Sequence, residues 1–414
     1  MPELRAAIRR LLGGEAAGDA APRPKRRYLA DAQEGVARAR AAGHERPIVF
    51  AVWPFALWNP IQVLLATRFD EFGVVPLGMD RLADLDDPTA LPALVAMRRD
   101  GVEVVLHLHW LARVLRGIES EAEGRARVAS FLAALDAFRT AGGRIVWTVH
   151  NVLPHDTKWP TVDVELRRGV VERADVIHVL SSETVAAAAG SYAIPASKVL
   201  YVPHPAYLGV YPDAVSDAEA RDRLGIGPHD VVFGLVGSLQ RYKGLDDLLD
   251  GFEAATASPP DERRRRLVIA GMPAADPSID AFLVRARANP DVVVDARRIP
   301  AEELSIPLRA SDVIVLPYHD SLNSGALLLA LSFGRPVIAA RSPHVNETVG
   351  PDASITFDPD DRGALAMALR DVDRLLTPAA RQAALATAQR FDRADLSRQF
   401  AVALRERLGL GPAS

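Results

Sequence analysis

The chain of 414 residues contains no cysteine, which excludes disulfides, thiolate metal sites and cysteine nucleophiles. It also lacks any apolar run near the roughly 20 residues that a membrane-spanning helix needs. Its first residues have no long apolar core of the kind that marks a secretory signal, so a cytoplasmic protein is expected. The formal net charge is −4. Nucleic-acid-binding domains usually carry a basic surplus, so no nucleic acid is expected as a partner.

Short runs of β-branched and apolar residues alternate with longer segments of helical period along most of the chain. This pattern is typical of parallel sheets that are covered by helices on both faces. The length suits two such α/β domains. The strands are expected at 47–53, 102–110, 144–150, 176–181 and 198–204, and then at 231–237, 266–271, 292–296, 313–317 and 336–340.

Composition divides the chain into five predicted segments. These are a flexible basic segment (1–44), an N-terminal domain (45–212), a linker (213–230), a C-terminal domain (231–390) and a final helix that packs back on the N-terminal domain (391–414). The basic stretch at 22–27 has two interpretations. One is a frayed, solvated terminus. The other is contact with the anionic surface of an inner membrane.

The loop after the first strand of the second domain places two cations at a strand end, where ligands of open parallel sheets bind. Gly237 permits a tight turn there, and Ser238 follows it. Arg241 and Lys243 suit a diphosphate, one as a planar fork and the other as a point charge. The alternative is a solvated loop with two surface cations.

A second loop, at 317–325, leads into an apolar helix of the same domain. Asn323 or Ser324 would cap this helix, and the unpaired amides of its first turn, from Gly325 on, form an anion site. Two anion-binding features at one end of one sheet favour a nucleotide diphosphate over simple helix capping.

The second domain resembles the donor-binding domain of GT-B glycosyltransferases, in particular retaining glycosyltransferase family 4. The family's Gly-Arg-Leu-x-x-x-Lys-Gly loop is matched at Gly237, Leu239, Lys243 and Gly244, with Ser238 at the usual Arg position and Arg241 as its expected substitute. The family's Gly-x-Pro-Val follows at 334–337. Its two Glu positions fall on Ser321 and Leu329, so its contact between Glu and the donor ribose does not carry over.

This resemblance covers roughly residues 45–405 and is closest to divergent exopolysaccharide-type members. It implies a GT-B fold, in which two Rossmann-like domains have parallel sheets facing a central cleft. It also implies a UDP- or GDP-linked sugar donor as co-substrate, no further cofactor and no metal. In the family a Thr-x-His at a strand end lies beside the donor sugar, which gives His150 the catalytic assignment. His150 would donate a hydrogen bond to a sugar hydroxyl or to developing charge, and Asn151 would line the same pocket. The alternative is a histidine that caps a backbone carbonyl.

Other aromatic and polar residues follow strands of the first domain. His109 and Trp110 suit either an acceptor sugar or packing at a strand end, and Trp53 and Asn59 flank an apolar segment that would shape an acceptor pocket. His107 shares a face with His109, but no third ligand stands at metal spacing, so zinc is not expected. Asp84–Asp87 is interpreted as a solvated turn.

The predicted function is therefore transfer of a sugar from a nucleoside-diphosphate sugar to a hydroxyl of a glycan or lipid-linked acceptor, with retention of configuration and without metal. Two alternatives remain open. One is a nucleotide-sugar epimerase, which would convert the donor with no acceptor. The other is a non-catalytic binding protein of the same fold.

Overall fold

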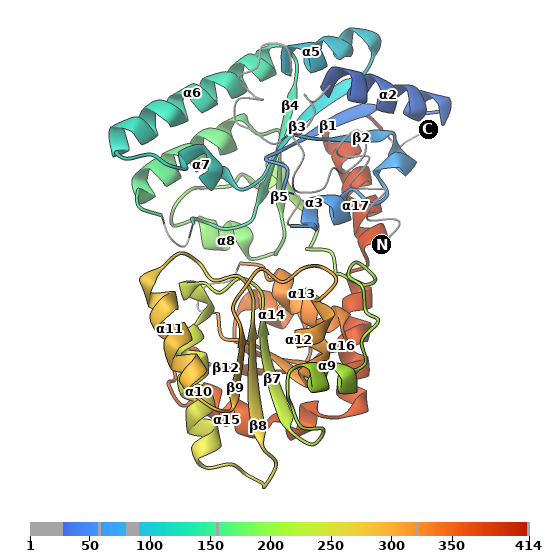
Figure 1. Cartoon of the computed structure of the whole chain (residues 1–414). Helices are drawn as coiled ribbons and strands as arrows, with labels where there is room; N and C mark the ends of the chain where they lie inside the picture. Colours follow the sequence, from blue (N-terminus) through green and yellow to red (C-terminus); the bar gives the residue numbers. More distant parts are fainter. Residues whose placement is uncertain (1–27, 57–58, 80–90, 155–156, 319–321, 412–414) are drawn as a thin grey trace. The chain divides into compact units, whose positions relative to one another are not determined.

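A computed structural model describes residues 28–56, 59–79, 91–154, 157–318 and 322–411. The chain divides into two compact units (Figure 1). The described residues up to Pro205, together with those from Arg393 on, form the N-terminal unit, and Ala206–Asp392 form the C-terminal unit. The basic stretch at 22–27 and the turn at 84–87 lie outside the described residues.

The N-terminal unit is built on a six-stranded parallel sheet of order β2-β1-β3-β4-β5-β6. Every residue of β1 and β3 is buried, which explains their nearly continuous apolar sequence. The edge strand β2 was not predicted, since it is short and contains Pro76. The strands are β1 (Ile48–Trp53), β2 (Val74–Gly78), β3 (Glu103–Leu108), β4 (Arg144–Val149), β5 (Val176–Val179) and β6 (Val199–Tyr201).

Helices cover this sheet, and the last of them comes from the end of the chain. Helix α17 (Arg393–Arg407) packs against α3 (Ile61–Leu65) and the short helix η1 (Phe69–Phe72) (Figure 1). Helix α2 (Tyr28–Ala41) contacts β2. Residues 28–41 are therefore an ordered part of the unit, which corrects the prediction of a flexible segment up to residue 44. The remaining helices are α5 (Leu91–Ala96), α6 (Glu121–Thr140), α7 (Pro160–Arg173) and α8 (Thr184–Ala188), with short helices η2 (Met97–Asp100), η3 (Leu111–Leu115) and η4 (Ala196–Lys198).

The C-terminal unit is also built on a six-stranded parallel sheet, of order β12-β11-β10-β7-β8-β9. The predicted architecture of two Rossmann-like α/β domains is thus confirmed. Its edge strand β12, four residues long, is the second strand that the sequence analysis missed. The strands are β7 (Val231–Val236), β8 (Arg265–Ala270), β9 (Val292–Asp295), β10 (Val313–Leu316), β11 (Val337–Ala340) and β12 (Ser354–Phe357).

Helices again flank this sheet, and β7, β10 and β11 are neighbours within it, so the loops after these three strands emerge side by side. The helices are α9 (Asp217–Arg223), α10 (Leu245–Ala257), α11 (Pro277–Ala288), α12 (Ser305–Ala310), α13 (Gly325–Ser332), α14 (Pro343–Thr348), α15 (Ala364–Arg370) and α16 (Pro378–Arg390), with short helices η5 (Arg241–Lys243) and η6 (Val372–Leu375).

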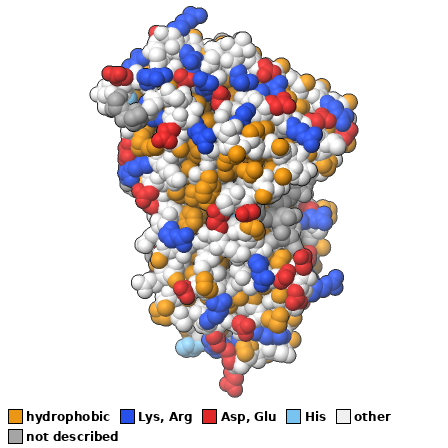
Figure 2. All heavy atoms as spheres, turned by 180° about the vertical axis from the view of Figure 1, so that it is seen from behind, with side chains coloured by type: hydrophobic (Ala, Val, Ile, Leu, Met, Phe, Trp, Pro, Cys, Tyr) orange, Lys and Arg blue, Asp and Glu red, His pale blue; other side chains and the backbone are white. Residues whose placement is uncertain are grey.

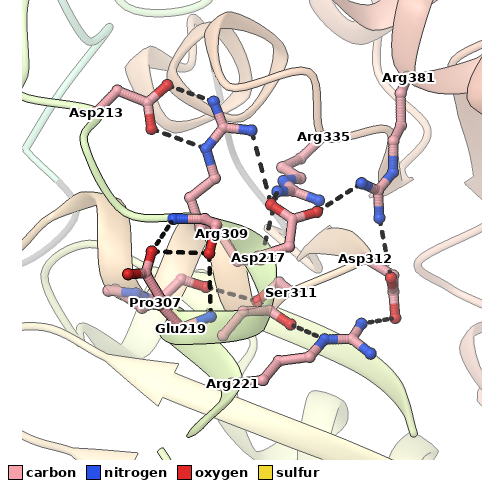
Figure 3. Close-up of polar contacts among 12 residues, drawn as sticks. Asp213, Asp217, Glu219, Arg221, Pro307, Arg309, Ser311, Asp312, Arg335 and Arg381 are labelled. Carbon is pink, nitrogen blue, oxygen red and sulfur yellow. Dashed lines mark hydrogen bonds and ion pairs between the residues drawn. The ribbon is translucent and has the colours of Figure 1, made fainter. Parts of the chain in front are cut away.

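Residues 213–230, predicted as a linker, belong to the C-terminal unit and contain helix α9, which packs on α12. A capping box between Ser216 and Glu219 begins this helix. Asp217, at its start, accepts from Arg335 and from Arg381, the latter at 2.6 Å (Figure 3). Because Arg335 is almost fully buried, this contact fixes the helix to the core.

No described helix combines the length and apolarity that crossing a membrane requires. On the face drawn in Figure 2, cationic and anionic side chains are interspersed.

Candidate functional site

The loop after β7 packs its backbone tightly against the ends of neighbouring strands. Gly244 has φ 62°. A Cβ at this position would lie 2.2 Å from the carbonyl oxygen of Pro317, at the end of β10, so only glycine fits here. A Cβ at Gly271 would lie 1.8 Å from the carbonyl oxygen of Gly237. These close approaches fix where the loop presents Lys243.

Lys243 is buried at the end of the sheet, with only 5% of its surface exposed. Its Nζ lies 5.2 Å from the centroid of the Tyr318 ring, in a cation–π contact. The same Nζ would be 3.1 Å from a Cβ at Gly237, so the ammonium group lies over that glycine. Burial lowers the pKa of Lys243 to about 8. Of the acidic side chains that the structure describes, none forms an ion pair with it. A buried ammonium with no counter-ion is unfavourable in the free protein and is suited to an anionic ligand.

Arg241, two residues earlier on η5, is exposed. Its charge acts on Asp276, the N-cap of α11. Hydrogen bonds from Ser278 lower the pKa of Asp276, and Arg241 lowers it further. The structure therefore buries one of the two predicted cations and leaves the other on the surface near α11.

The start of helix α13 lies in the loop after β10. The Ser324 side chain accepts from the Leu327 amide at 3.1 Å and is the cap of this helix. The amides of the first turn, from Gly325 on, have no carbonyl partner within the helix. The backbone N–H of Ser324 donates to Nε2 of His344 at 3.0 Å. Burial lowers the pKa of His344 to about 4, so its ring is neutral.

His344 and Tyr318 are two residues that the sequence analysis did not single out. His344 follows β11 and Tyr318 follows β10, so both could have been found by applying the strand-end rule to every strand of the sheet. The loops after three adjacent strands thus carry the buried cation Lys243 (after β7), the helix cap Ser324 (after β10) and the neutral His344 (after β11). Ser238 follows Gly237 on the same loop, and Asn323 precedes the cap of α13.

The N-terminal unit contains a continuous set of polar contacts at the ends of β3, β4 and β5, here called the histidine chain. It consists of His150, His109, His107, Thr148 and His178. His150 Nε2 lies 2.8 Å from His109 Nδ1, and His109 Nε2 lies 3.2 Å from His107 Nδ1. His107 Nε2 lies 2.6 Å from Thr148 Oγ1, which lies 2.9 Å from His178 Nδ1. His178 Nε2 donates to the carbonyl of Val202 at 2.9 Å.

Aromatic rings surround this chain and keep water from most of it. Phe400 of α17 lies 4.9 Å from the His178 ring and 5.9 Å from the His107 ring, between centroids. Burial, with a smaller effect of neighbouring histidines, lowers the pKa of His150 to about 3. Burial lowers the pKa of His178 to about 4 and those of His107 and His109 well below the ordinary value. All four rings are therefore neutral at neutral pH.

The other residues predicted for the acceptor side are placed differently from one another. Trp110 is half-buried and stacks on His150, with ring centroids 4.5 Å apart. Asn151 is exposed beside it. Asn59 Oδ1 accepts from the Ile61 amide at 3.2 Å and so caps α3. Trp53 is fully buried against Phe131, which makes it a core residue in this structure and corrects its assignment to an acceptor pocket.

Among the described residues, no group of three His, Cys, Asp or Glu side chains is arranged to hold a metal ion.

Comparison with known proteins matches residues 230–373 to the family model of glycosyl transferases group 1. A GDP-mannose:glycolipid 4-beta-D-mannosyltransferase from Xanthomonas campestris is 30% identical over 277 residues, which are 64% of this chain and 70% of that protein. The chain belongs to the group 1 glycosyl transferases. This confirms the predicted resemblance to GT-B glycosyltransferases.

A further relative is also a glycosyltransferase, and solved structures share the fold. A D-inositol 3-phosphate glycosyltransferase from Corynebacterium aurimucosum is 27% identical over 208 residues, 47% of this chain and 49% of that protein. Sucrose-phosphate synthase from Thermosynechococcus elongatus has a similar fold, with a TM-score of 0.60 at 16% identity over 88% of this chain and all of that one. Anabaena HepE, solved with UDP and glucose, has a similar fold with a TM-score of 0.62 at 15% sequence identity, over 87% of this chain and all of that one. The fold is GT-B, and the protein is a glycosyltransferase that uses a nucleotide-sugar donor.

Proposed function

We propose that this glycosyltransferase moves a sugar from a nucleoside-diphosphate sugar to a hydroxyl of a glycolipid or glycan, with retention of configuration and without a metal ion or other cofactor. The single observation that carries the proposal is the buried ammonium of Lys243, which forms an ion pair with none of the described acidic side chains and lies on the loop after β7, next to the strand that leads to α13. A diphosphate would supply the counter-ion that this cation lacks, and the first-turn amides would bind its oxygens. Arg241, on the surface of the loop after β7, would approach the diphosphate from the solvent side. The other proposed contacts are Gly237 and Ser238 on that loop, with Asn323 and Gly325 on the loop after β10.

A lysine and a helix start can take over the charge stabilisation that a metal ion gives a leaving diphosphate in other enzymes. Turnover is therefore expected to persist when EDTA is added. A loss that Mg²⁺ or Mn²⁺ restores would contradict metal independence.

The donor site is tested by calorimetry with UDP and GDP on the full chain. Lys243→Met keeps the length of the side chain and removes its charge, so we expect at least tenfold weaker binding of the preferred nucleotide, about 1.4 kcal/mol. Arg241→Met, the matched control on the same loop, removes an exposed charge and is expected to have the smaller effect. Equal affinity in the Lys243 variant and the unaltered protein would refute the diphosphate assignment.

The proposal of retention follows the resemblance to the retaining family. An inverting transfer needs a side chain that removes the acceptor proton, and burial lowers the pKa of His150 to about 3, which makes this ring a weak base for that step. In a front-face route the leaving phosphate oxygen takes that proton instead. The anomeric configuration of the first product, followed by NMR with a donor of known configuration, tests this. The Xanthomonas relative is named for a beta linkage, which an alpha-linked GDP-mannose yields only by inversion, so that name counts against retention. A product inverted relative to its donor would refute retention while leaving the donor site intact.

The acceptor class follows from the glycolipid named for the same relative. Trp110, Asn59 and Asn151 are the proposed contacts on the acceptor side. His109 is buried and both of its ring nitrogens contact other histidines, which corrects its assignment to the acceptor pocket. A matched pair of acceptors, one lipid-linked and one a free saccharide with the same terminal sugar, separates glycolipid from glycan use. We also propose that the basic stretch at 22–27 brings the enzyme to an anionic membrane, which co-sedimentation with anionic and neutral vesicles would test.

A further inference from the structure

Tyr318 carries a buried polar group that the rest of the described chain does not use. The residue follows β10, and only 8% of its surface is exposed. In the part of the chain that the structure describes, its hydroxyl has no hydrogen-bond partner. A buried hydroxyl that is left unpaired costs the free energy of its lost hydration, so most such groups in folded proteins are hydrogen-bonded. The hydroxyl of Tyr318 is therefore suited to a partner from outside the chain.

Packing between two loops brings this tyrosine to Lys243. Strands β7 and β10 are neighbours in the sheet, and the carbonyl oxygen of Pro317 lies so close to Gly244 that no Cβ fits between them. The adjoining residues, Lys243 and Tyr318, are held next to each other as a result, with Nζ of the lysine 5.2 Å from the centroid of the tyrosine ring. Because the hydroxyl belongs to that ring, one phosphate with a hydrogen bond of about 2.8 Å on each side is large enough to contact both groups.

We propose that the Tyr318 hydroxyl donates a hydrogen bond to a phosphoryl oxygen of the donor diphosphate, beside the oxygen that pairs with Lys243. This inference rests on the proposed function, which places a diphosphate at Lys243. A phosphoryl oxygen offers only lone pairs and the phenol has a proton to give, so the direction of the bond is fixed. Tyr318 then has two tasks, since its ring face holds the ammonium and its hydroxyl binds the ligand.

The other polar groups near this point are engaged elsewhere or lie on the surface. The Ser324 hydroxyl caps α13, and the Ser324 amide donates to His344. Arg241 is exposed on its loop. Tyr318 is thus a second buried donor beside Lys243, and a neutral one. It adds a hydrogen bond to the diphosphate without the cost of burying a second charge.

The phenol keeps its proton throughout the transfer. Burial, with a smaller effect of the neighbouring Tyr242, raises the pKa of Tyr318 above its ordinary value. The hydroxyl therefore acts as a fixed hydrogen-bond donor and not as an acid that gives up its proton. A donor of this kind, already in place before the reaction, stabilises negative charge that develops on the leaving diphosphate.

Tyr318→Phe tests the hydroxyl alone, because it keeps the ring over Lys243. Calorimetry on the full chain with UDP and GDP should show about tenfold weaker binding of the preferred nucleoside diphosphate. The corresponding nucleoside, which has no phosphate, should bind the variant and the unaltered protein equally. Tyr242→Phe removes a hydroxyl from a half-buried tyrosine of the same loop region and should change the affinity for the diphosphate by less than about twofold.

The stability of the nucleotide-free protein supplies a second readout that a structural role would move. The removed hydroxyl has no partner in the described chain, so Tyr318→Phe should unfold at a temperature at least as high as the unaltered protein. A lower thermal midpoint, or a variant that does not fold, would show that the hydroxyl serves the fold and would overturn the inference. Undiminished affinity for UDP and GDP, the result expected if only a water molecule contacts the hydroxyl, would overturn it too. So would an equal loss of affinity for the nucleoside.

Lys243→Met separates this inference from the proposed function. Undiminished nucleotide binding in Lys243→Met would refute the donor site itself. Weakened binding in Lys243→Met together with undiminished binding in Tyr318→Phe would leave the donor site in place and overturn the role of Tyr318 alone.

Discussion

Lowering the pH from 7.5 to 5.5 is expected to destabilise the N-terminal unit strongly, although no carboxylate of ordinary pKa titrates in that range. The reason lies in His107, His109, His150 and His178. Burial lowers the pKa of each one well below the ordinary value of 6.5, to about 3 for His150 and about 4 for His178. These rings therefore stay neutral in the folded unit at pH 5.5, whereas in the unfolded chain they take up protons.

The sign and size of the effect follow from proton linkage. A histidine whose pKa is lowered on folding stabilises the folded state above the unfolded pKa, and this stabilisation is lost as the pH falls toward the folded pKa. At pH 5.5, one unit below the unfolded pKa, the loss is about 1.4 kcal/mol for each group. For the four histidines it is roughly 5 kcal/mol, a large part of the 5–15 kcal/mol that typically stabilises a domain.

The measurement uses a favourable feature of the sequence. All five tryptophans of the sequence, at positions 53, 58, 110, 147 and 159, precede Pro205, and those that the structure describes belong to the N-terminal unit. Urea unfolding followed by tryptophan fluorescence at pH 7.5 and 5.5 therefore reports that unit. His178→Gln removes one of the four groups, so the difference between the two pH values should fall by about a quarter. A difference below about 1 kcal/mol in the unaltered protein would refute the reasoning, since it would mean that these histidines are protonated in the folded state.

Three further predictions concern the C-terminal unit. Lys243→Met should raise the stability of the nucleotide-free protein by up to about 3 kcal/mol, because burial of this ammonium lowers its pKa to about 8. Differential scanning calorimetry at pH 7 without nucleotide measures this change, and a destabilised variant would contradict the prediction. Gly244→Ala should cost about 2 kcal/mol or more and abolish nucleotide binding, since φ is 62° and the Cβ would lie 2.2 Å from the Pro317 carbonyl oxygen; unchanged urea unfolding would show that the loop can move away. Asp217→Asn should cost about 2 kcal/mol, because the buried Arg335 loses its carboxylate (Figure 3). Asp213→Asn removes a partner of the more exposed Arg309 and should cost under about 1 kcal/mol, so equal losses in this pair would argue against burial as the cause.

The elements that the sequence analysis predicted correctly are those whose residues form a recognisable local pattern. The central strands were predicted because they are buried on both faces and therefore read as apolar runs. The edge strands β2 and β12 were missed because they are short, and only one side of each is paired. Helix α9 was taken for a linker because its own sequence, Asp-Ala-Glu-Ala-Arg-Asp-Arg, has almost no apolar face. It is held by ion pairs of Asp217 with Arg335 and Arg381 and of Arg221 with Asp312, and these partners lie about 90 or more residues away in the sequence.

The residues of the candidate site also divide into those that local spacing predicts and those whose place depends on packing. The glycine-rich loop, Lys243 and the cap of α13 could be found from local spacing. The exposure of Arg241, the burial of Trp53 and the contact of His344 with Ser324 depend on packing between segments that are distant in sequence. For His150 the strand-end rule located the residue, and its role toward the sugar stays a prediction. Its contacts with the other histidines form only when β3, β4 and β5 are aligned, which local sequence does not show.

The two units bury different kinds of polar group. One buries a charged ammonium and the other buries neutral histidine rings. The C-terminal unit buries the ammonium of Lys243, which pairs with no described acidic side chain, so a diphosphate would bind there with the desolvation of Lys243 already complete. The N-terminal unit buries histidine rings that contact one another and Thr148. Replacing Lys243 should therefore stabilise the free enzyme and weaken its nucleotide binding, whereas replacing Thr148, which contacts His107 and His178, should destabilise the N-terminal unit without weakening nucleotide binding. If the substitutions at Lys243 and Thr148 changed stability and nucleotide binding in the same direction, the different roles given to the two buried groups would be wrong.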